Sequence, residues 1–179
     1  MKTVVLVFHP HWEQSRVNKA LVKGLDSQIE VRNMYQLYPD FQIDVATEHR
    51  VLEAADRIVL QFPMYWWYSS PALLKQWEDD VLSYGWAYGT GGTALHGKEL
   101  MIAVSPGADN YGPEGFAKYS VRQLLRPFQA TSRLIGTTYL KPFVTTGAAS
   151  LTDSQLATQV QQYHNYVRND DLVALGDFE

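Results

Sequence analysis

The stretch TVVLVFHPHWEQS, residues 3–15, decides the fold class of this chain. Its first six residues are apolar or β-branched without interruption, which is typical of a strand buried on both faces of a parallel sheet. A loop containing His-Pro-His follows, and Val17, Leu21 and Leu25 then recur at helical spacing. A buried strand that passes through a short loop into a helix is the repeating unit of parallel α/β sheets.

The rest of the chain repeats this alternation of strand and helix. Strands are predicted at residues 3–8, 28–34, 56–62, 99–105 and 135–139, and helices at residues 15–25, 44–55, 71–84, 120–130 and 152–168. The alternative for the fifth strand is that it continues to Thr146 with an interruption at Pro142. Five strands fit a doubly wound parallel sheet of order 2-1-3-4-5 with helices on both faces. We therefore expect an α/β fold with one domain over residues 1–169 and an acidic C-terminal tail over residues 170–179.

The composition excludes several kinds of chemistry. The 179 residues include no cysteine, which excludes disulfides, zinc–thiolate and iron–sulfur sites, and cysteine nucleophiles. The five histidines lack the paired spacing of metal ligands, so no metal site is expected. A net charge of −4 gives no electrostatic basis for binding nucleic acid. The absence of cysteine fits a cytoplasmic protein, and any redox activity must come from a bound cofactor.

In a sheet of this order, ligands bind at the carboxyl ends of the strands, beside the first strand. Three loops are predicted to meet there, at residues 9–14, 63–70 and 106–119. Candidate binding residues are therefore expected in these loops.

The first loop leads into a helix N-terminus, where free backbone N–H groups can bind a phosphate without lysine or arginine. Ser15 could donate its hydroxyl to that phosphate, and Asn18 could brace the loop. The alternative is that Ser15 is simply the N-cap of the helix. His9 also has two interpretations, a ligand contact or a hydrogen-bonded structural residue at the strand end.

Four successive aromatic residues, 65–68, follow the third strand. Loops are usually solvated, so four large rings there predict a flat ligand that stacks on them. The alternative is that the rings form a dimer interface or pack beneath the next helix. The Gly-rich segment 85–97 is a second candidate for a dimer interface.

The third loop begins with SPGADNY, residues 105–111. Gly107 allows the backbone to approach a flat ligand closely. Tyr111 carries a phenol that could stabilise negative charge on that ligand, and the alternative is a surface tyrosine.

Taken together, these loops and their flanking segments resemble a known family, the flavodoxin-like NAD(P)H:quinone oxidoreductases. Within it the chain is most similar to the bacterial branch of general-stress NAD(P)H oxidoreductases and ancillary subunits of Kef glutathione-gated potassium efflux systems. The resemblance is carried by HPHWEQSRVNKAL (9–21), NMYQLYPDFQID (33–44), QFPMYWWYSSPALLKQWEDDVLSYGWAYG (61–89), ALHGKELMIAVSPG (94–107) and LLRPFQATSRLIGTTYLKPF (124–143).

The resemblance implies a homodimeric cytoplasmic flavoprotein that binds FMN, or FAD as in the larger members. Carried over by position, the residues that would contact the flavin are His9, Ser15, Arg16, Val17, Asn18, Pro63, Met64, Tyr65, Trp66, Ser105, Pro106, Gly107 and Ala108. Many members have Thr-Thr-Gly-Gly at the last four positions. Here Pro106 removes one N–H donor, and Tyr111 lacks the histidine partner that the family places near the flavin.

The activity that the resemblance implies is two-electron transfer from NAD(P)H through the flavin to a quinone, in ping-pong order, with Tyr111 in a minor catalytic role. Three alternatives stay open. The chain could be a regulatory subunit of a potassium efflux transporter at the inner face of the membrane, a one-electron carrier of the flavodoxin type, or a nitro- or azo-compound reductase.

Overall fold

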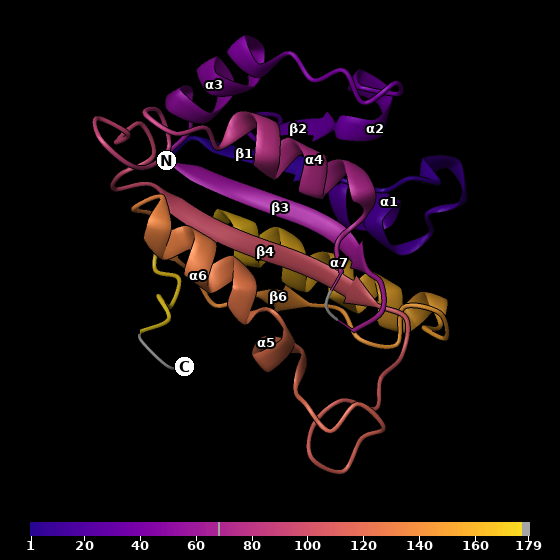
Figure 1. Cartoon of the computed structure of the whole chain (residues 1–179). Helices are drawn as coiled ribbons and strands as arrows, with labels where there is room; N and C mark the ends of the chain where they lie inside the picture. The colour runs from indigo at the N-terminus through magenta and orange to yellow at the C-terminus, as the bar shows by residue number, and fades with distance from the viewer. Residues whose placement is uncertain (68, 177–179) are drawn as a thin grey trace.

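A computed structural model describes residues 1–67 and 69–176 of the chain. Its centre is a parallel sheet of order β2-β1-β3-β4-β5, and a sixth short strand, β6, also pairs with β4 (Figure 1). The strands are β1 Thr3–Val7, β2 Glu30–Asn33, β3 Arg57–Met64, β4 Glu99–Pro106, β5 Thr138–Tyr139 and β6 Phe143–Val144. The predicted order 2-1-3-4-5 is confirmed.

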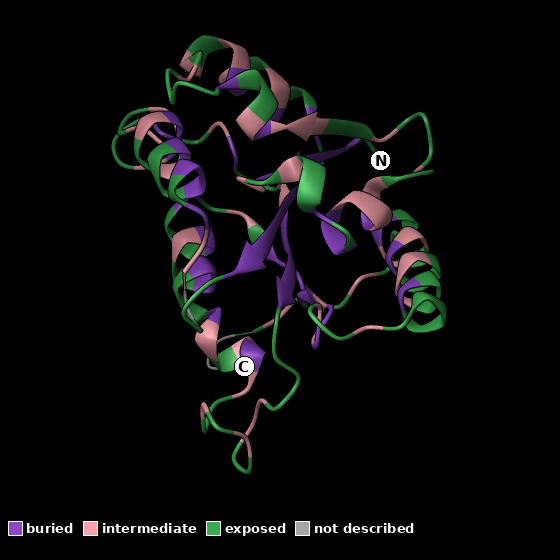
Figure 2. Ribbon diagram, turned by 90° about the vertical axis from the view of Figure 1, so that its right-hand side faces the viewer, coloured by how far each residue is buried: buried purple, intermediate pink, exposed green. Residues whose placement is uncertain are grey.

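Helices cover both faces of the sheet, as predicted (Figure 1). α1 Val17–Val22 and α7 Asp153–Arg168 pack on one face, where they bury Leu21, Tyr163 and Val167 against the central strands. On the other face lie α3 Val45–Ala54, α4 Ala72–Val81, α5 Val121–Leu124 and α6 Arg126–Leu134, with the short α2 Met34–Leu37 beside β2. β1, β3 and most of β4 are buried between these layers (Figure 2). No helix in the described part of the chain is both long enough and apolar enough to cross a membrane.

The fifth position of the sheet is divided. β5 and β6 both pair with β4, and Pro142, which has no N–H for the ladder, lies between them. The outer edge of β5 is covered by the C-terminal segment 172–176. There Leu175 N–H donates to the oxygen of Tyr139, and Lys141 N–H donates to the oxygen of Val173. Residues 177–179 of the predicted tail lie outside the described part of the chain.

Several element boundaries differ from the predictions. The predicted helix 120–130 is two helices, α5 and α6, because Pro127 cannot continue the hydrogen-bond ladder of α5. Pro63, Met64 and Pro106 were predicted in loops and instead end strands β3 and β4, where Pro63 pairs with Ser105 and Met64 with Pro106. The predicted helix at 15–25 begins later, at Val17, and the 3-10 turn Trp12–Gln14 precedes it.

Candidate functional site

A cavity of about 350 Å³ lies where β1, β3 and β4 end, at the carboxyl edge of the sheet. We call it the edge cavity. Its size is typical of small-ligand sites, and its position is the one expected for a doubly wound sheet. The lining residues are His9, Gln14, Ser15, Arg16, Val17, Asn18, Pro63, Met64, Tyr65, Ser105, Gly107, Ala148 and Ala149. The three predicted loops therefore do converge on one cavity.

Four predicted residues do not line this cavity. Trp66 is 75% exposed. The backbone oxygens of Pro106 and Ala108 accept hydrogen bonds from Ala148 N–H and Gly147 N–H, respectively, and thereby hold the turn after β6 beside the cavity. The fourth, Tyr111, packs at the margin of the core, and burial raises the pKa of its phenol.

Ser15 lines the cavity with a buried polar group that a ligand could satisfy. It is 5% exposed, and its hydroxyl has no hydrogen-bond partner among the described residues. The alternative of an N-cap is wrong, because the residue at the N-cap of α1 is Arg16 and no side chain caps this helix. A buried hydroxyl without a hydrogen-bond partner is unfavourable by about 1–3 kcal/mol. A ligand oxygen that accepts from this hydroxyl would remove that cost.

His9 combines both interpretations made from the sequence. It lines the edge cavity, and its Nδ1 accepts a hydrogen bond from His11 N–H at 3.2 Å. Burial, with a smaller contribution from His11, lowers the pKa of His9. A neutral imidazole that accepts at Nδ1 carries its proton on Nε2, which leaves one donor for a ligand.

Arg16 joins the first loop to the start of α7. Its guanidinium donates to the oxygen of Leu151 at 2.8 Å and to the carboxylate of Asp153 at 2.6 Å. The charge of Arg16 is therefore already paired on the rim of the cavity. Its main structural effect is to hold the turn that follows β6 against the N-terminus of α1.

The aromatic loop after β3 is a tight turn closed by two hydrogen bonds between the backbones of Tyr65 and Ser69. Trp66 and Trp67 adopt φ values of 48° and 59°, the left-handed region that side-chain-bearing residues rarely occupy. The ring of Trp67 lies 6.1 Å from that of Phe116, so this loop contacts the segment after β4. Tyr68, the last of the four predicted aromatic residues, lies outside the described part of the chain.

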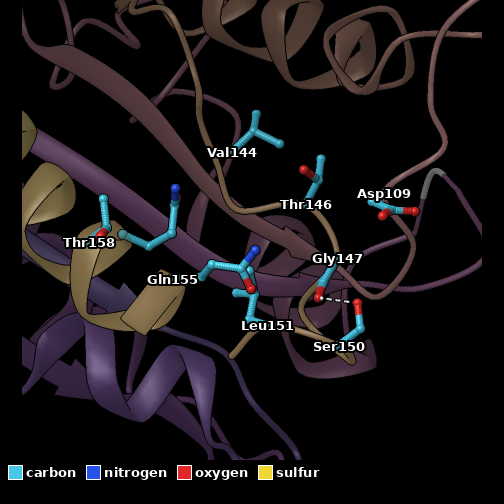
Figure 3. A pocket seen from close by; sticks show the side chains of 9 residues that line it. Asp109, Val144, Thr146, Gly147, Ser150, Leu151, Gln155 and Thr158 are labelled. Atoms are coloured by element: carbon cyan, nitrogen blue, oxygen red, sulfur yellow. Dashed lines mark hydrogen bonds between the residues drawn. The ribbon is translucent and has the colours of Figure 1, made fainter. Parts of the chain in front are cut away.

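A second cavity, of about 390 Å³, lies beside the turn 147–151 (Figure 3). Its lining is mostly uncharged and polar, and the Ser150 hydroxyl donates to the Gly147 oxygen at 3.3 Å. Volume does not distinguish the two cavities. The edge cavity is the better candidate because it lies at the switch point of the sheet and contains the unpartnered Ser15 hydroxyl.

Sequence reasoning missed three lining residues, Gln14, Ala148 and Ala149. The alanines follow β6, whose carboxyl end lies at the same edge of the sheet as those of β3 and β4. The small residues of GAAS, 147–150, leave room for a ligand to lie close to the backbone. Their position directly after the fifth strand, at the carboxyl edge of the sheet, could have predicted that they line the site.

Comparisons with known proteins agree with this geometry. The family model for the flavodoxin-like fold matches residues 1–167. General stress protein 14 of Bacillus subtilis is 51% identical over 94% of this chain and 98% of its own length. The uncharacterized NAD(P)H oxidoreductase YrkL of the same organism is 48% identical over the same shares. The potassium-efflux ancillary protein KefF of Salmonella typhimurium is 44% identical over 89% of this chain and 92% of its own length.

Solved structures extend the comparison. A Treponema denticola general stress protein 14 in complex with FMN is 36% identical, with a TM-score of 0.85 over 93% of this chain and 98% of that one. An NADPH-quinone reductase from P. pentosaceus is 32% identical, with a TM-score of 0.84 over 94% and 99%. A structure described as a thermophilic tryptophan halogenase is 53% identical, with a TM-score of 0.89 over 93% and 99%. The chain belongs to the flavodoxin-like family that includes general stress protein 14, NAD(P)H oxidoreductases and the potassium-efflux ancillary proteins.

Proposed function

We propose that this chain is an FMN-dependent NAD(P)H:quinone oxidoreductase and that FMN binds in the edge cavity. The observation that carries the proposal is the buried, unpartnered hydroxyl of Ser15 at the wall of that cavity. The names of the relatives, and the FMN complex of one of them, support the same assignment and favour FMN over FAD.

The residues of the edge cavity fit the parts of such a cofactor. Ser15 and the backbone N–H groups at the start of α1 would bind the phosphate, with His9 donating from Nε2. Pro63, Met64 and Tyr65 on one side, and Ser105 and Gly107 on the other, would enclose the ring system. Gly107 has open space where a Cβ would be, so the backbone there can lie close to a flat ligand.

FMN held by these residues would supply two-electron redox chemistry between NAD(P)H and a quinone. Tyr65 and the exposed ring of Trp66 offer one aromatic platform beside the cavity for the nicotinamide and the quinone. Two substrates that share one platform bind in turn, which is ping-pong order. Tyr111, for which a minor catalytic role was expected, does not line the edge cavity, so its phenol is not among the groups that would contact the cofactor there.

The test is FMN binding and turnover with Ser15→Ala. We expect wild-type protein to keep FMN through gel filtration, to bleach when NADPH is added without oxygen, and to recover colour when a quinone is added. Loss of one hydrogen bond to a charged phosphate should weaken FMN binding roughly tenfold or more. Ser83→Ala, at the opposite edge of the sheet, should leave the dissociation constant unchanged.

Each contrary result has a defined meaning. Wild-type protein that binds no FMN would overturn the proposal. A stable one-electron intermediate during titration would favour a flavodoxin-type carrier, and faster turnover with nitro or azo compounds than with quinones would favour those acceptors.

We also propose that the chain forms a homodimer through its exposed aromatic cluster, Trp66, Trp67 and Phe116. This is compatible with a substrate platform at Trp66, because a cofactor can lie at a dimer interface. Trp66 and Phe116 are 75% and 77% exposed, and their rings are linked through contacts with Trp67. Exposed aromatic patches of this kind are typical of interaction surfaces. The segment 85–97, the other candidate, directly precedes β4 and so lies at the opposite edge of the sheet.

Light scattering coupled to gel filtration checks this proposal. We expect the mass of a dimer for wild-type protein and of a monomer for Phe116→Asp, which adds a charge to the cluster without altering the core. A wild-type monomer at every concentration would contradict it.

A second role, as a regulatory subunit of a potassium efflux transporter, is favoured by the 44% identity with KefF. In that case we propose a cytoplasmic protein that is recruited to the inner face of the membrane by its partner. Co-purification with such a transporter, compared between wild-type protein and Ser15→Ala, would separate this role from the reductase activity.

A further inference from the structure

A network of four buried polar side chains runs from α7 along one face of the sheet to the edge cavity. The hydroxyl of Tyr163 donates to Oε1 of Gln61 at 2.7 Å. Nε2 of Gln61 donates to the backbone oxygen and to Oδ1 of Asn18, at 3.0 and 3.3 Å. Nδ2 of Asn18 then donates to Oγ of Ser105 at 2.8 Å. Ser105 is 4% exposed, and the other three residues are more deeply buried.

One atom, the backbone oxygen of Asn18, fixes the direction of every hydrogen bond in this network of four side chains. A carbonyl oxygen can only accept, so the group of Gln61 that faces it must be the NH₂. Oε1 of Gln61 must then face Tyr163, whose hydroxyl therefore donates. The same NH₂ faces Oδ1 of Asn18, and this leaves Nδ2 of Asn18 to face Ser105.

The consequence appears at Ser105, the last member of the network and a lining residue of the edge cavity. Its oxygen accepts from Asn18, so its own O–H proton is not used within the network. No described residue accepts that proton. The O–H proton of Ser105 is thus available for an acceptor atom of a molecule in the cavity.

We propose that Tyr163, Gln61 and Asn18 are positioning residues that hold Ser105 as a hydrogen-bond donor to an acceptor atom of the bound cofactor. The inference rests on the proposed function and adds to it a preference for an acceptor atom of the cofactor at this point. A carbonyl oxygen, an aromatic nitrogen or a hydroxyl oxygen at this point would accept the unused proton of Ser105, whereas a group that can only donate would leave that proton without an acceptor.

Tyr163 is well placed to anchor the network. Its ring packs against Phe143 with centroids 5.1 Å apart, and burial raises the pKa of its hydroxyl, so it stays protonated and can donate. Tyr166, one turn later on α7, packs against the same Phe143 ring at 5.6 Å. Its hydroxyl donates instead to the oxygen of Lys141. Tyr166 is therefore a matched control that does not belong to the hydrogen-bond network.

The experiment is a double-mutant cycle on the FMN dissociation constant, measured for wild-type protein, Tyr163→Phe, Ser105→Ala and the combination of both. We expect Tyr163→Phe to weaken binding by about twofold to tenfold, the range of one neutral hydrogen bond. In the Ser105→Ala background the same change should have less than about a twofold effect, because its route to the cofactor is gone. Ser105→Thr should restore binding, and Tyr166→Phe should leave it unchanged.

Equal weakening by Tyr163→Phe in both backgrounds would overturn the inference, because it would indicate a general loss of packing. No weakening in wild-type background would overturn it as well. Thermal unfolding shows whether Tyr163→Phe folds, and Gln61→Met in both backgrounds makes the same comparison if it does not. Failure of wild-type protein to bind FMN would contradict the proposed function itself. Normal FMN binding without coupling between Tyr163 and Ser105 would contradict only this inference.

Discussion

Trp66 and Trp67 hold a backbone conformation that is unfavourable for both. A left-handed φ costs a residue with a side chain about 1–2 kcal/mol, and glycine would avoid this cost. The turn between Tyr65 and Ser69 nevertheless places tryptophan there, with the ring of Trp66 exposed. Unfavourable geometry of this kind is typical of binding sites, where the position of a side chain matters more than local stability.

Replacing Trp66 separates these two effects. We expect both Trp66→Gly and Trp66→Ala to lower kcat/KM with NADPH and quinone several-fold, because both remove the platform ring. Trp66→Gly should be more stable than Trp66→Ala by about 1 kcal/mol, because only glycine tolerates the positive φ. Urea unfolding beside steady-state kinetics measures both quantities. Full activity of Trp66→Ala would show that the ring has no role in turnover.

At the same scale, the sequence predicts some binding residues better than others. Ser15 and Gly107 follow from their places after strands at the carboxyl edge, and Asn18 from its place in the first turn of the helix there, because the fold alone brings these segments together. Gln61 and Tyr163 could not be predicted as partners of Ser105. They are 102 residues apart, and their contact depends on how α7 packs across the sheet.

Among the elements, the groove between α4 and α6 contains a carboxyl group with a raised pKa, that of Glu78. Glu78 lines this groove together with Phe128 and Thr131. Burial raises the pKa of Glu78 to about 7, and the nearby Lys75 offsets only part of that effect. Near neutral pH, the folded protein therefore holds a proton on Glu78 that the unfolded chain would release.

Stability should therefore depend on pH through Glu78. Because its pKa is raised on folding, its contribution is fully present below about pH 4.5 and is lost as the pH rises through about 7. Glu78→Gln, which cannot ionise, should be more stable than wild-type protein by about 1–3 kcal/mol at pH 8, and this difference should vanish near pH 4.5. Urea unfolding across this range tests it, with the exposed Glu114→Gln as control. A constant difference at all pH values would contradict it.

The elements themselves differ in how far the sequence determines them. The central strands could be predicted because each is a mostly apolar run, and Pro142 marks the interruption of the fifth. The division of residues 120–130 into α5 and α6 was missed because the apolar pattern continues across Pro127. The pattern records which face is buried, whereas the break depends on a single missing N–H.

For the whole molecule, the C-terminal segment 172–176 joins the two layers. Leu172 packs against the apolar cluster under α1 and α7, and Leu175 packs against the cluster on the opposite face. Between them, the backbone pairs with β5 and Lys141. The side chain of Gln129 donates to the oxygen of Gly176 at 2.8 Å and fixes the end of the segment. An acidic composition alone did not predict this role.

Removal of residues 172–179 should therefore destabilise the fold by about 3 kcal/mol, from two half-buried leucines and two backbone hydrogen bonds. It should also cause concentration-dependent association, because the edge of β5 becomes free to pair. The double variant Leu172→Ala/Leu175→Ala keeps the backbone pairing, so it should lose about 2 kcal/mol without association. Urea midpoints and light scattering measure the two effects. A truncated chain as stable as the full one would contradict this.

The walls of the edge cavity come from four segments spread over about 140 residues, around positions 9–18, 63–65, 105–107 and 148–149. No shorter part of the chain contains the site, so a ligand that binds there binds only the fully folded state. The ligand concentration then affects the amount of folded protein by mass action. Each tenfold excess of such a ligand over its dissociation constant adds about 1.4 kcal/mol to the free energy of unfolding. In a cell, the availability of the cofactor would thus set how much of this protein survives proteolytic turnover.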